Sequence, residues 1–373
     1  MVRSDTIRVG VIGAGHMGST HARNLRDGKV SGATLAAVSD PGTEALLSFS
    51  DVARFASSSE LIRSGAVDAV LIATPHYDHT PLTIEALEQG LHVLVEKPLA
   101  VHKADCEAML SAYARRPSRG QVFAEMFNQR TDPRFCKLRA LIQAGELGAL
   151  RRVNWIITDW FRSEAYYKGS SWRATWAGEG GGVLLNQAPH NLDLWQWLFG
   201  MPARIHAFCG FGRFHEIEVE DQVTAYFEYA SGATGVFVTT TGEAPGTNRL
   251  EVAGDMGKIV LDSEGLAFTR NEVSAAEFIK TSLASFSPPA VWHVRVPVAA
   301  GGANQHVAIM QNFANAILHD EPLIAPAVEG VHSVELANAM IYSSLTAKTV
   351  ELPLDSAAYA NELARLRAAS RAR

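Results

Sequence analysis

Residues 7–18 read IRVGVIGAGHMG, an apolar strand that runs directly into a glycine-rich turn. A helix-like stretch follows over residues 19–25. In a strand, turn and helix of this kind, Gly13 permits the tight turn, Gly15 lets the backbone approach a diphosphate, and Gly18 lets the helix pack closely on the strand. The helix N-terminus then faces the phosphates. The stretch therefore predicts a dinucleotide-binding unit.

Asp40 ends a second predicted strand, residues 34–39, and lies 22 residues beyond Gly18. This is about the spacing at which an acidic residue meets the adenosine ribose. Its carboxylate would accept hydrogen bonds from both ribose hydroxyls and repel a 2′-phosphate, and residues 41–43 include no arginine or lysine to bind one. We therefore predict NAD rather than NADP. An alternative is that Asp40 only caps the helix that follows Pro41.

Length and composition limit the class of protein. A chain of 373 residues with 47% hydrophobic and 19% charged residues can bury a large core, and its length suggests two domains. A net charge of -6 gives no basic surface for nucleic acid. No apolar run approaches the ~20 residues that cross a bilayer, and the first strand starts too early for a signal peptide. We expect a cytoplasmic protein whose basic end, residues 365–373, frays.

Apolar strands and helices alternate along the first third of the chain. Strands are expected over residues 67–73, 91–95 and 121–127, and helices over 80–89 and 103–114. Such alternation predicts an α/β fold with a doubly wound parallel sheet. We assign residues 1–127 to this Rossmann domain.

The texture changes after residue 128, where short strands follow one another. Strands are expected over residues 153–161, 203–211, 221–229, 235–241 and 249–253, and helices over 133–144, 183–198, 304–318 and 328–347. This pattern predicts an α+β domain, residues 128–373, with a mainly antiparallel open sheet, whose last helices can pack back on the first domain. The Ser- and Pro-rich residues 284–297 are expected to form a loop.

Glu96-Lys97-Pro98 follows the strand expected over residues 91–95, so Lys97 stands at the carboxyl edge of the parallel sheet. Open α/β folds bind their ligands at this edge. Thr74-Pro75 ends another strand there. A lysine beside a bound cofactor loses hydration, which lowers its pKa and suits it to proton handling.

A second polar group, Asn186, His190 and Asp193, follows the glycine run at residues 180–182. In a single helix Asn186 and His190, four residues apart, lie on one face. Alone, His190 could equally be a core histidine, because Pro189 bends or starts the helix. Beside a cofactor crevice that carries a lysine, we interpret it as catalytic.

The sequence gives no support for a metal or disulfide site. Cys106, Cys136 and Cys209 form no Cys-x-x-Cys pair and are interpreted as small core residues. His76 and His79 have the spacing of a metal pair, but we place them in a loop with no third ligand nearby and expect no metal.

Together these motifs resemble the glucose-fructose oxidoreductase, inositol dehydrogenase and rhizopine catabolism (Gfo/Idh/MocA) family of NAD(P)-dependent sugar and cyclitol dehydrogenases. The matching positions are Gly13 to Gly18, Ala73-Thr74-Pro75 with His79, Glu96-Lys97-Pro98, Phe127-Asn128 with Arg130 and Pro133, and Gly181-Gly182 leading to His190. In such proteins the lysine and a helical pair, usually Asp and then His four residues later, surround the carbon that is oxidised. This chain departs from the pattern at Asn186.

The resemblance implies that the protein oxidises a secondary hydroxyl of a sugar, cyclitol or glycoside by hydride transfer to NAD. His190 is the expected base, because an imidazole of pKa ~6.5 suits proton removal near neutral pH. Lys97 is expected to stabilise the developing alkoxide. Asn186 cannot stabilise an imidazolium by charge, so we expect it to orient a substrate hydroxyl.

Two rival functions remain at this stage. In one, NAD transiently oxidises a sugar carbon so that a glycosidic group can be eliminated without net redox change. In the other, the chain is a non-catalytic regulator that senses a dinucleotide, which the presence of Lys97 and His190 disfavours.

The expected site residues fall into two sets. At the cofactor we expect Gly13, Gly15, His16, Met17, Gly18, Asp40, Thr74, Pro75, His79, Glu96 and Lys97. At the substrate we expect Asn128, Arg130, Tyr166, Trp172, Arg173, Trp176, Asn186, His190 and His306, with Tyr167 a weaker candidate. The expected partners are a small polyol, sugar or glycoside and, through the open sheet, copies of the chain in a homodimer or homotetramer, with no nucleic acid and no membrane.

Overall fold

A parallel six-stranded sheet forms from the first third of the chain, in the order β3-β2-β1-β4-β5-β6. The computed structural model describes residues 6–169, 172–301 and 304–370. The strands are β1 (Ile7–Ile12), β2 (Ala33–Ser39), β3 (Ala53–Phe55), β4 (Ala69–Ile72), β5 (His92–Val95) and β6 (Phe123–Glu125). The chain order reverses between β1 and β4, which is where doubly wound sheets bind ligands.

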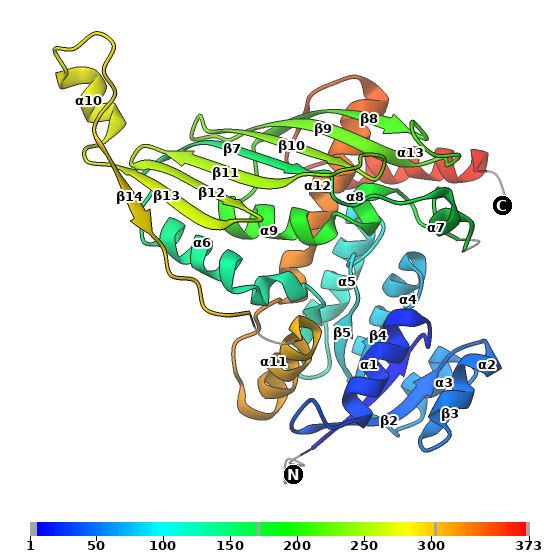
Figure 1. Ribbon diagram of the computed structural model, residues 1–373. Coiled ribbons are helices and arrows are strands. Elements are labelled where there is room, and N and C mark those ends of the chain that lie inside the picture. Colours follow the sequence, from blue (N-terminus) through cyan, green and yellow to red (C-terminus); the bar gives the residue numbers. More distant parts are fainter. Residues whose placement is uncertain (1–5, 170–171, 302–303, 371–373) are drawn as a thin grey trace.

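Helices on both faces connect these strands (Figure 1). They are α1 (His16–Arg26), α2 (Thr43–Leu46), α3 (Ser58–Arg63), α4 (His76–Glu88) and α5 (Lys103–Ala114), with short 3-10 helices at Leu47–Phe49 and Asn128–Thr131. Helix α3 begins where Ser57 accepts a hydrogen bond from the Glu60 main-chain nitrogen, as a capping box predicts.

The loop predicted around His76 and His79 is wrong, because both residues belong to the first turn of α4. In the sequence, Pro81 favoured a helix that begins at residue 80, because proline is common in the first turn of a helix. The structure instead holds Pro81 inside the helix. Pro75 precedes the helix with an extended backbone, φ −56° and ψ 153°, and the helix begins directly after it.

A nine-stranded sheet, in the order β14-β13-β12-β11-β7-β10-β9-β8-β15, forms the second layer. Its strands are β7 (Leu150–Ile157), β8 (Arg204–Phe211), β9 (Glu220–Glu228), β10 (Thr234–Thr240), β11 (Asn248–Gly254), β12 (Gly257–Asp262), β13 (Gly265–Asn271), β14 (Val291–Arg295) and β15 (Val350–Glu351). Only β10 and β7 pair in parallel among the neighbours in this sheet as described. The predicted mainly antiparallel sheet is therefore confirmed.

Strand β14 lies within residues 284–297, where a loop was predicted, so that prediction is wrong. All five residues of β14 are exposed. The strand is therefore held by its backbone pairing with β13 and by Trp292, whose ring lies against Arg270 of β13, rather than by burial. The Ser and Pro residues that precede it favoured a loop.

The helices of the second half are α6 (Pro133–Gln143), α7 (Glu164–Lys168), α8 (Val183–Asn186), α9 (Pro189–Phe199), α10 (Ala275–Thr281), α11 (Gln305–His319), α12 (Ala327–Thr346) and α13 (Ser356–Ala369). Helices α6 and α9 lie on the side of the large sheet that faces the first domain (Figure 1). Helix α11 packs Met310 and Phe313 into the core of the parallel sheet beside Val9 and Leu71. The last third of the chain thus returns to the first domain.

The single helix predicted over residues 183–198 is wrong, because it is broken into α8 and α9. Pro189 has no N–H, and its ring would clash with a helical carbonyl four residues earlier. It is tolerated as the first residue of α9. Asn186 and His190 therefore do not share a face of one helix.

Two smaller predictions also need correction. Residues 365–369, expected to fray, are helical in α13, and residues 371–373 lie outside the described chain. Cys106 is buried as expected, but Cys136 is exposed and Cys209 is only partly buried. Among the described residues, none of the helices is long and apolar enough to span a membrane.

Candidate active site

A cleft of about 760 Å³ opens at the carboxyl ends of β1, β4 and β5, between the parallel sheet and the loop before α8. Twelve of the predicted site residues line it: Gly13, Gly15, His16, Met17, Asp40, Thr74, Pro75, Glu96, Lys97, Trp172, Arg173 and Asn186. Residues that the sequence analysis missed also line it, among them Ser58, His76 and Asp78.

The three glycines of the first turn differ in their surroundings. Gly13 has φ +90°, a conformation that favours glycine, and a Cβ there would lie 2.7 Å from the Ala73 carbonyl oxygen. A Cβ on Gly18 would lie 1.7 Å from the Gly13 carbonyl oxygen, so α1 packs directly on the turn. Around Gly15 there is open space, with nothing within 4 Å of a Cβ.

Gly15 is also the N-cap of α1, and no side chain caps the helix there. The first main-chain N–H groups of the helix remain available to an anion. The open space above Gly15 and these donors fit the diphosphate of a dinucleotide.

Asp40 lies at the end of β2 and holds the glycine turn. Its Oδ2 accepts a hydrogen bond from the Ala14 nitrogen at 2.7 Å, and its Oδ1 accepts one from the Gly42 nitrogen at 2.8 Å. Helix α2 starts at Thr43 without a side-chain cap, so the alternative that Asp40 caps this helix is not supported. A carboxylate offers about four acceptor positions, and two of them remain for a ligand.

Glu96 is buried beside the cleft and pairs with His21, whose Nε2 lies 2.7 Å from Glu96 Oε1. Burial by itself would raise the pKa of Glu96, but the hydrogen bond and charge of His21, with the charge of Lys97, lower it to about 2. The His306 ring lies 5.6 Å from the His21 ring. His21 was not predicted; its only sequence signal is a polar residue on the buried face of α1.

Lys97 is held by the chain before α9, because its Nζ donates a hydrogen bond to the Asn186 carbonyl oxygen at 2.7 Å. Burial lowers the pKa of Lys97. The negative charges of Glu96 and Glu179 oppose this effect, whereas the positive charge of Arg173 adds to it. Lys97 thus has a fixed position and a lowered pKa, so it loses its proton more readily than an exposed lysine does.

His190 packs against the edge of the Phe127 ring, with the ring centres 6.1 Å apart. Its Nδ1 is buried without a hydrogen-bond partner in the described structure. Burial, reinforced by the charge of Lys97, lowers the pKa of His190 to about 3. The expectation of an imidazole that titrates near 6.5 is therefore corrected: this ring is neutral throughout the physiological range.

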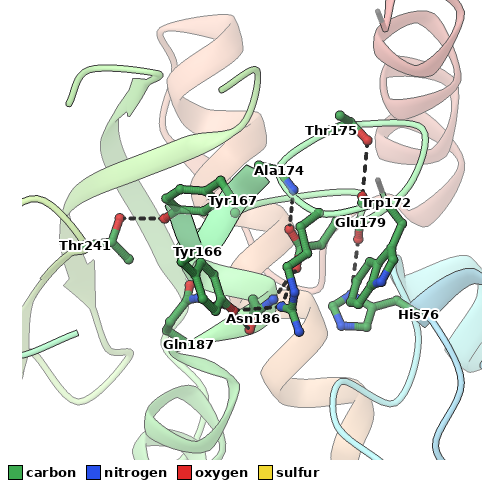
Figure 2. A network of polar contacts seen from close by, with 12 residues as sticks. His76, Tyr166, Tyr167, Trp172, Ala174, Thr175, Glu179, Asn186, Gln187 and Thr241 are labelled. Carbon is green, nitrogen blue, oxygen red and sulfur yellow. Dashed lines mark hydrogen bonds and ion pairs between the residues drawn. The ribbon is translucent and has the colours of Figure 1, made fainter. Parts of the chain in front are cut away.

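Asn186, the last residue of α8, belongs to a polar network with residues of α7 and of the loop before α8 (Figure 2). Its side-chain nitrogen donates to Glu179, and its side-chain oxygen accepts from the Tyr166 hydroxyl at 3.4 Å. Arg173 donates to the same hydroxyl at 2.7 Å and lies over the Trp172 ring. The network ties Asn186 to three predicted substrate residues.

Other predicted residues are engaged elsewhere. Arg130 is buried and binds both carboxylate oxygens of Asp193, at 2.8 and 2.6 Å, and Glu329 at 2.5 Å, so its assignment to the substrate is not supported. Trp176 is a core residue packed on Phe211, and its assignment is not supported either.

His79, Asn128 and Tyr167 also have internal partners. His79 is buried and bonds to the Pro98 and Thr74 carbonyl oxygens. Asn128 donates to Gln305 at 3.1 Å, and the Tyr167 hydroxyl donates to Thr241 at 2.9 Å. None of these three residues lines the cleft, so their assignment to a ligand is not supported.

A second cleft, of about 750 Å³, lies between α6, the start of α9, the strands β11 and β12 and the turn after β12. Its polar and aromatic lining includes Asp159, Trp160 and Asn248. Three more of its lining residues, Gln129, Asn191 and Gln305, are chain neighbours of the predicted site residues Asn128, His190 and His306. The second cleft therefore begins close to the catalytic candidates.

Comparison with known proteins agrees with this architecture. Residues 7–124 match the family described as "Oxidoreductase family, NAD-binding Rossmann fold", and residues 135–260 match the GFO/IDH/MocA C-terminal domain. The chain is 28% identical to inositol 2-dehydrogenase of Rubrobacter xylanophilus, over 91% of each protein. It is 29% identical to scyllo-inositol 2-dehydrogenase (NAD(+)) of Bacillus subtilis, over 68% of this chain and 73% of that one.

Solved structures give the same result. The WlbA dehydrogenase of Chromobacterium violaceum, in complex with NADH and UDP-GlcNAcA, is similar with a TM-score of 0.79 and 26% identity, over 95% of this chain and 98% of that one. A levoglucosan dehydrogenase in complex with NADH shares the fold, with a TM-score of 0.75 and 21% identity, over 94% of this chain and 100% of that one. With its NAD-binding Rossmann domain and its matching second domain, the chain belongs to the GFO/IDH/MocA family of NAD-dependent oxidoreductases.

Proposed function

We propose that the protein oxidises a secondary hydroxyl of a cyclitol, sugar or glycoside, with NAD as the hydride acceptor. The observation that carries the proposal is a fixed Lys97 ammonium in the cofactor cleft, close enough to a partly buried, neutral His190 for its charge to help lower the pKa of that ring. The inositol dehydrogenases and the UDP-GlcNAcA-bound relative support polyol and sugar substrates.

Each of these residues has a role that its surroundings allow. NAD, when bound, accepts the hydride from the carbon that is oxidised. The neutral His190 takes the hydroxyl proton, and the Lys97 ammonium hydrogen-bonds the same oxygen. An alkoxide that develops next to Lys97 brings a negative charge near His190, which favours protonation of the ring at that moment. The surroundings of His190 thus keep the ring neutral and able to accept a proton. They stabilise the protonated ring only while the negative charge of the alkoxide is present.

The second cleft supports a substrate larger than one ring. Trp160 offers an apolar surface to C–H groups, and Asp159, Asn191 and Asn248 offer polar atoms for hydroxyls. On this basis we extend the proposal to glycosides and other substituted sugars, whose second ring would reach this cleft.

A screen of cyclitols, monosaccharides and glycosides with NAD tests the proposal. NADH absorbance and product composition are followed together, with Lys97→Ala as the matched control. We expect a keto product in proportion to the NADH formed. Cleaved glycoside without net NADH would replace the proposal with the redox-neutral reaction, and NAD binding without turnover of any substrate would favour the regulator.

Oligomeric state and location belong to the same proposal. Ile156, Phe208 and Tyr226, on three strands of the large sheet, are exposed by 39%, 70% and 42%. Exposed apolar side chains on one sheet favour contact with a second copy of the chain, and hence a homodimer or homotetramer. A cytoplasmic location is consistent with the free Cys106 thiol.

A further inference from the structure

Glu179 is a buried carboxylate that contacts two residues of the candidate active site, Asn186 and Arg173. Glu179 is 2% exposed and lies in the loop before α8. One oxygen accepts a hydrogen bond from the Ala174 nitrogen at 2.7 Å, and the other accepts from the side-chain amide of Asn186 (Figure 2). Arg173 Nη1 lies 3.7 Å from the second oxygen.

Asn186 links this carboxylate to Lys97. Its main-chain oxygen accepts from Lys97 Nζ at 2.7 Å, while its side-chain nitrogen donates to Glu179. One residue therefore contacts the ammonium through its backbone and the carboxylate through its side chain. The charge of Glu179 also acts directly, because it favours the ammonium form of Lys97 and opposes the effect of Arg173.

We propose that Glu179 is a positioning residue: it holds the side chain of Asn186 and supplies beside it a negative charge that acts on Lys97. It holds the Asn186 amide in one orientation, with nitrogen toward Glu179 and oxygen toward Tyr166, and it sustains the charge of Lys97. The role assigned to Lys97 rests on the proposed function, whereas the coupling of Glu179 to Asn186 does not.

The same contact explains why position 186 carries an amide. Glu179 needs an N–H donor there, and only the amide of Asn provides one at this length. With Asn186→Asp, two carboxylates would face each other at hydrogen-bonding distance, and like charges so close cannot both ionise without a large cost. Exchange of the two groups, Glu179→Gln together with Asn186→Asp, restores one carboxylate and one amide donor.

The groups that face the network set its pH dependence. The ionisable groups that interact with Glu179 or Lys97 include Arg173, Arg162, Glu96, Glu220, Tyr167, His76, His190 and His306. Burial raises the pKa of Glu179, and the hydrogen bonds from Ala174 and Asn186 oppose this. Loss of the Glu179 charge removes support for the Lys97 ammonium, so Lys97 would lose its proton at lower pH.

Kinetics of four enzymes test the proposal: the native enzyme, Glu179→Gln, Asn186→Asp and the double variant. Each single substitution should lower kcat roughly tenfold or more, and the double variant should recover most of that loss, since coupled residues are not additive. In Glu179→Gln the basic limb of kcat/KM should move to lower pH, with NAD affinity unchanged. The control is Glu125→Gln, a buried carboxyl outside this network whose pKa burial raises well above its usual value.

Thermal unfolding without substrate provides a second test. In Asn186→Asp the facing carboxylates raise the pKa of one of them in the folded state, so the variant loses stability as pH rises above the unfolded value. The deficit in Tm relative to the native protein should therefore be larger at pH 8 than at pH 5. The double variant should show no such increase.

The outcomes separate the two proposals. A Tm deficit for Asn186→Asp that is equal at both pH values, losses that multiply in the double variant, or an unmoved basic limb in Glu179→Gln would each overturn the role of Glu179. If Glu179→Gln does not fold, the pH dependence of Tm for Asn186→Asp still decides the coupling. Absence of a substrate, with the Tm behaviour as expected, would count against the proposed function alone.

Discussion

The positive charge of Lys97 disfavours a second positive charge on the nearby His190, and burial acts in the same direction. For both residues burial is the largest cause of the lowered pKa. At the scale of single residues, the site therefore separates the two roles: a neutral ring that can accept a proton, and an ammonium that stabilises negative charge.

We predict that Lys97→Ala and His190→Ala each lower turnover by roughly 10²-fold or more, the usual scale of lost acid–base help. NAD affinity, measured by titration, should stay nearly constant.

Because the pKa of His190 is about 3, kcat/KM of the native enzyme should show no acidic limb from this ring between pH 5 and 9. At high pH, kcat/KM should fall as Lys97 loses its proton. Because burial lowers the pKa of Lys97, this fall should begin at a lower pH than for an ordinary lysine. An acidic limb near 6.5 that disappears in His190→Ala would contradict this assignment.

Asp40 carries the second prediction at this scale. NAD should bind more tightly than NADP, because the carboxylate can accept from the free ribose hydroxyls and opposes a phosphate. Asp40→Ala should weaken NAD binding by roughly tenfold, the loss expected for one or two charged hydrogen bonds, and should narrow the difference between the cofactors. Dissociation constants for both cofactors decide this; equal affinities in the native protein would refute the assignment.

At the scale of elements, the strand β1 and the helix α1 are coupled through the glycine turn. We predict that two similar glycine-to-alanine substitutions affect different properties: one lowers the stability of the fold, and the other lowers NAD affinity. Gly18→Ala places a Cβ 1.7 Å from the Gly13 carbonyl oxygen and should destabilise the fold by about 1–3 kcal/mol or more, as overpacking does. Gly15→Ala meets nothing within 4 Å and has φ −64°, so Tm should change little while NAD affinity falls. Thermal unfolding with and without NAD measures both, and equal Tm losses would be inconsistent with the geometry.

At the scale of the whole molecule, the two domains meet at the cleft, and a buried ion pair joins them: Lys103 of α5 lies 2.8 Å from the carboxylate of Glu335 in α12. Arg130 binds Asp193 of α9 and Glu329 of α12, which connects the chain between the domains to the helices of the second. The sequence predicts a domain boundary at residue 128, and we propose the same position for the folded chain.

The open face of the large sheet leads to the last prediction. If Phe208 and Ile156 contact a second copy, Phe208→Asp should reduce the mass measured by light scattering to that of a smaller species, because a buried unpaired charge opposes association. Leu283→Asp, in an exposed segment outside this sheet, is the matched control. A native protein that is monomeric at micromolar concentration would exclude this interface.

Local patterns were enough to predict most of the fold. The run of residues 7–18 predicts β1, the glycine turn and α1, and the structure has β1 at Ile7–Ile12. Lys97 and Asp40 were found because the carboxyl edge of a parallel sheet is a property of chain order, which the sequence displays. The fold class, the family and the NAD cofactor follow from the same short-range signals.

What the tertiary structure alone decided depends on burial and on contacts that no regular spacing along the chain predicts. The low pKa of His190, the pairing of Glu96 with His21 and the contact of Asn186 with Glu179 have no local pattern. Arg130 has the sequence position of a ligand residue, yet its charge is satisfied by Asp193, 63 residues away. A sequence specifies which side chains can ionise or donate, but their state depends on desolvation and on neighbours that only the folded chain brings together.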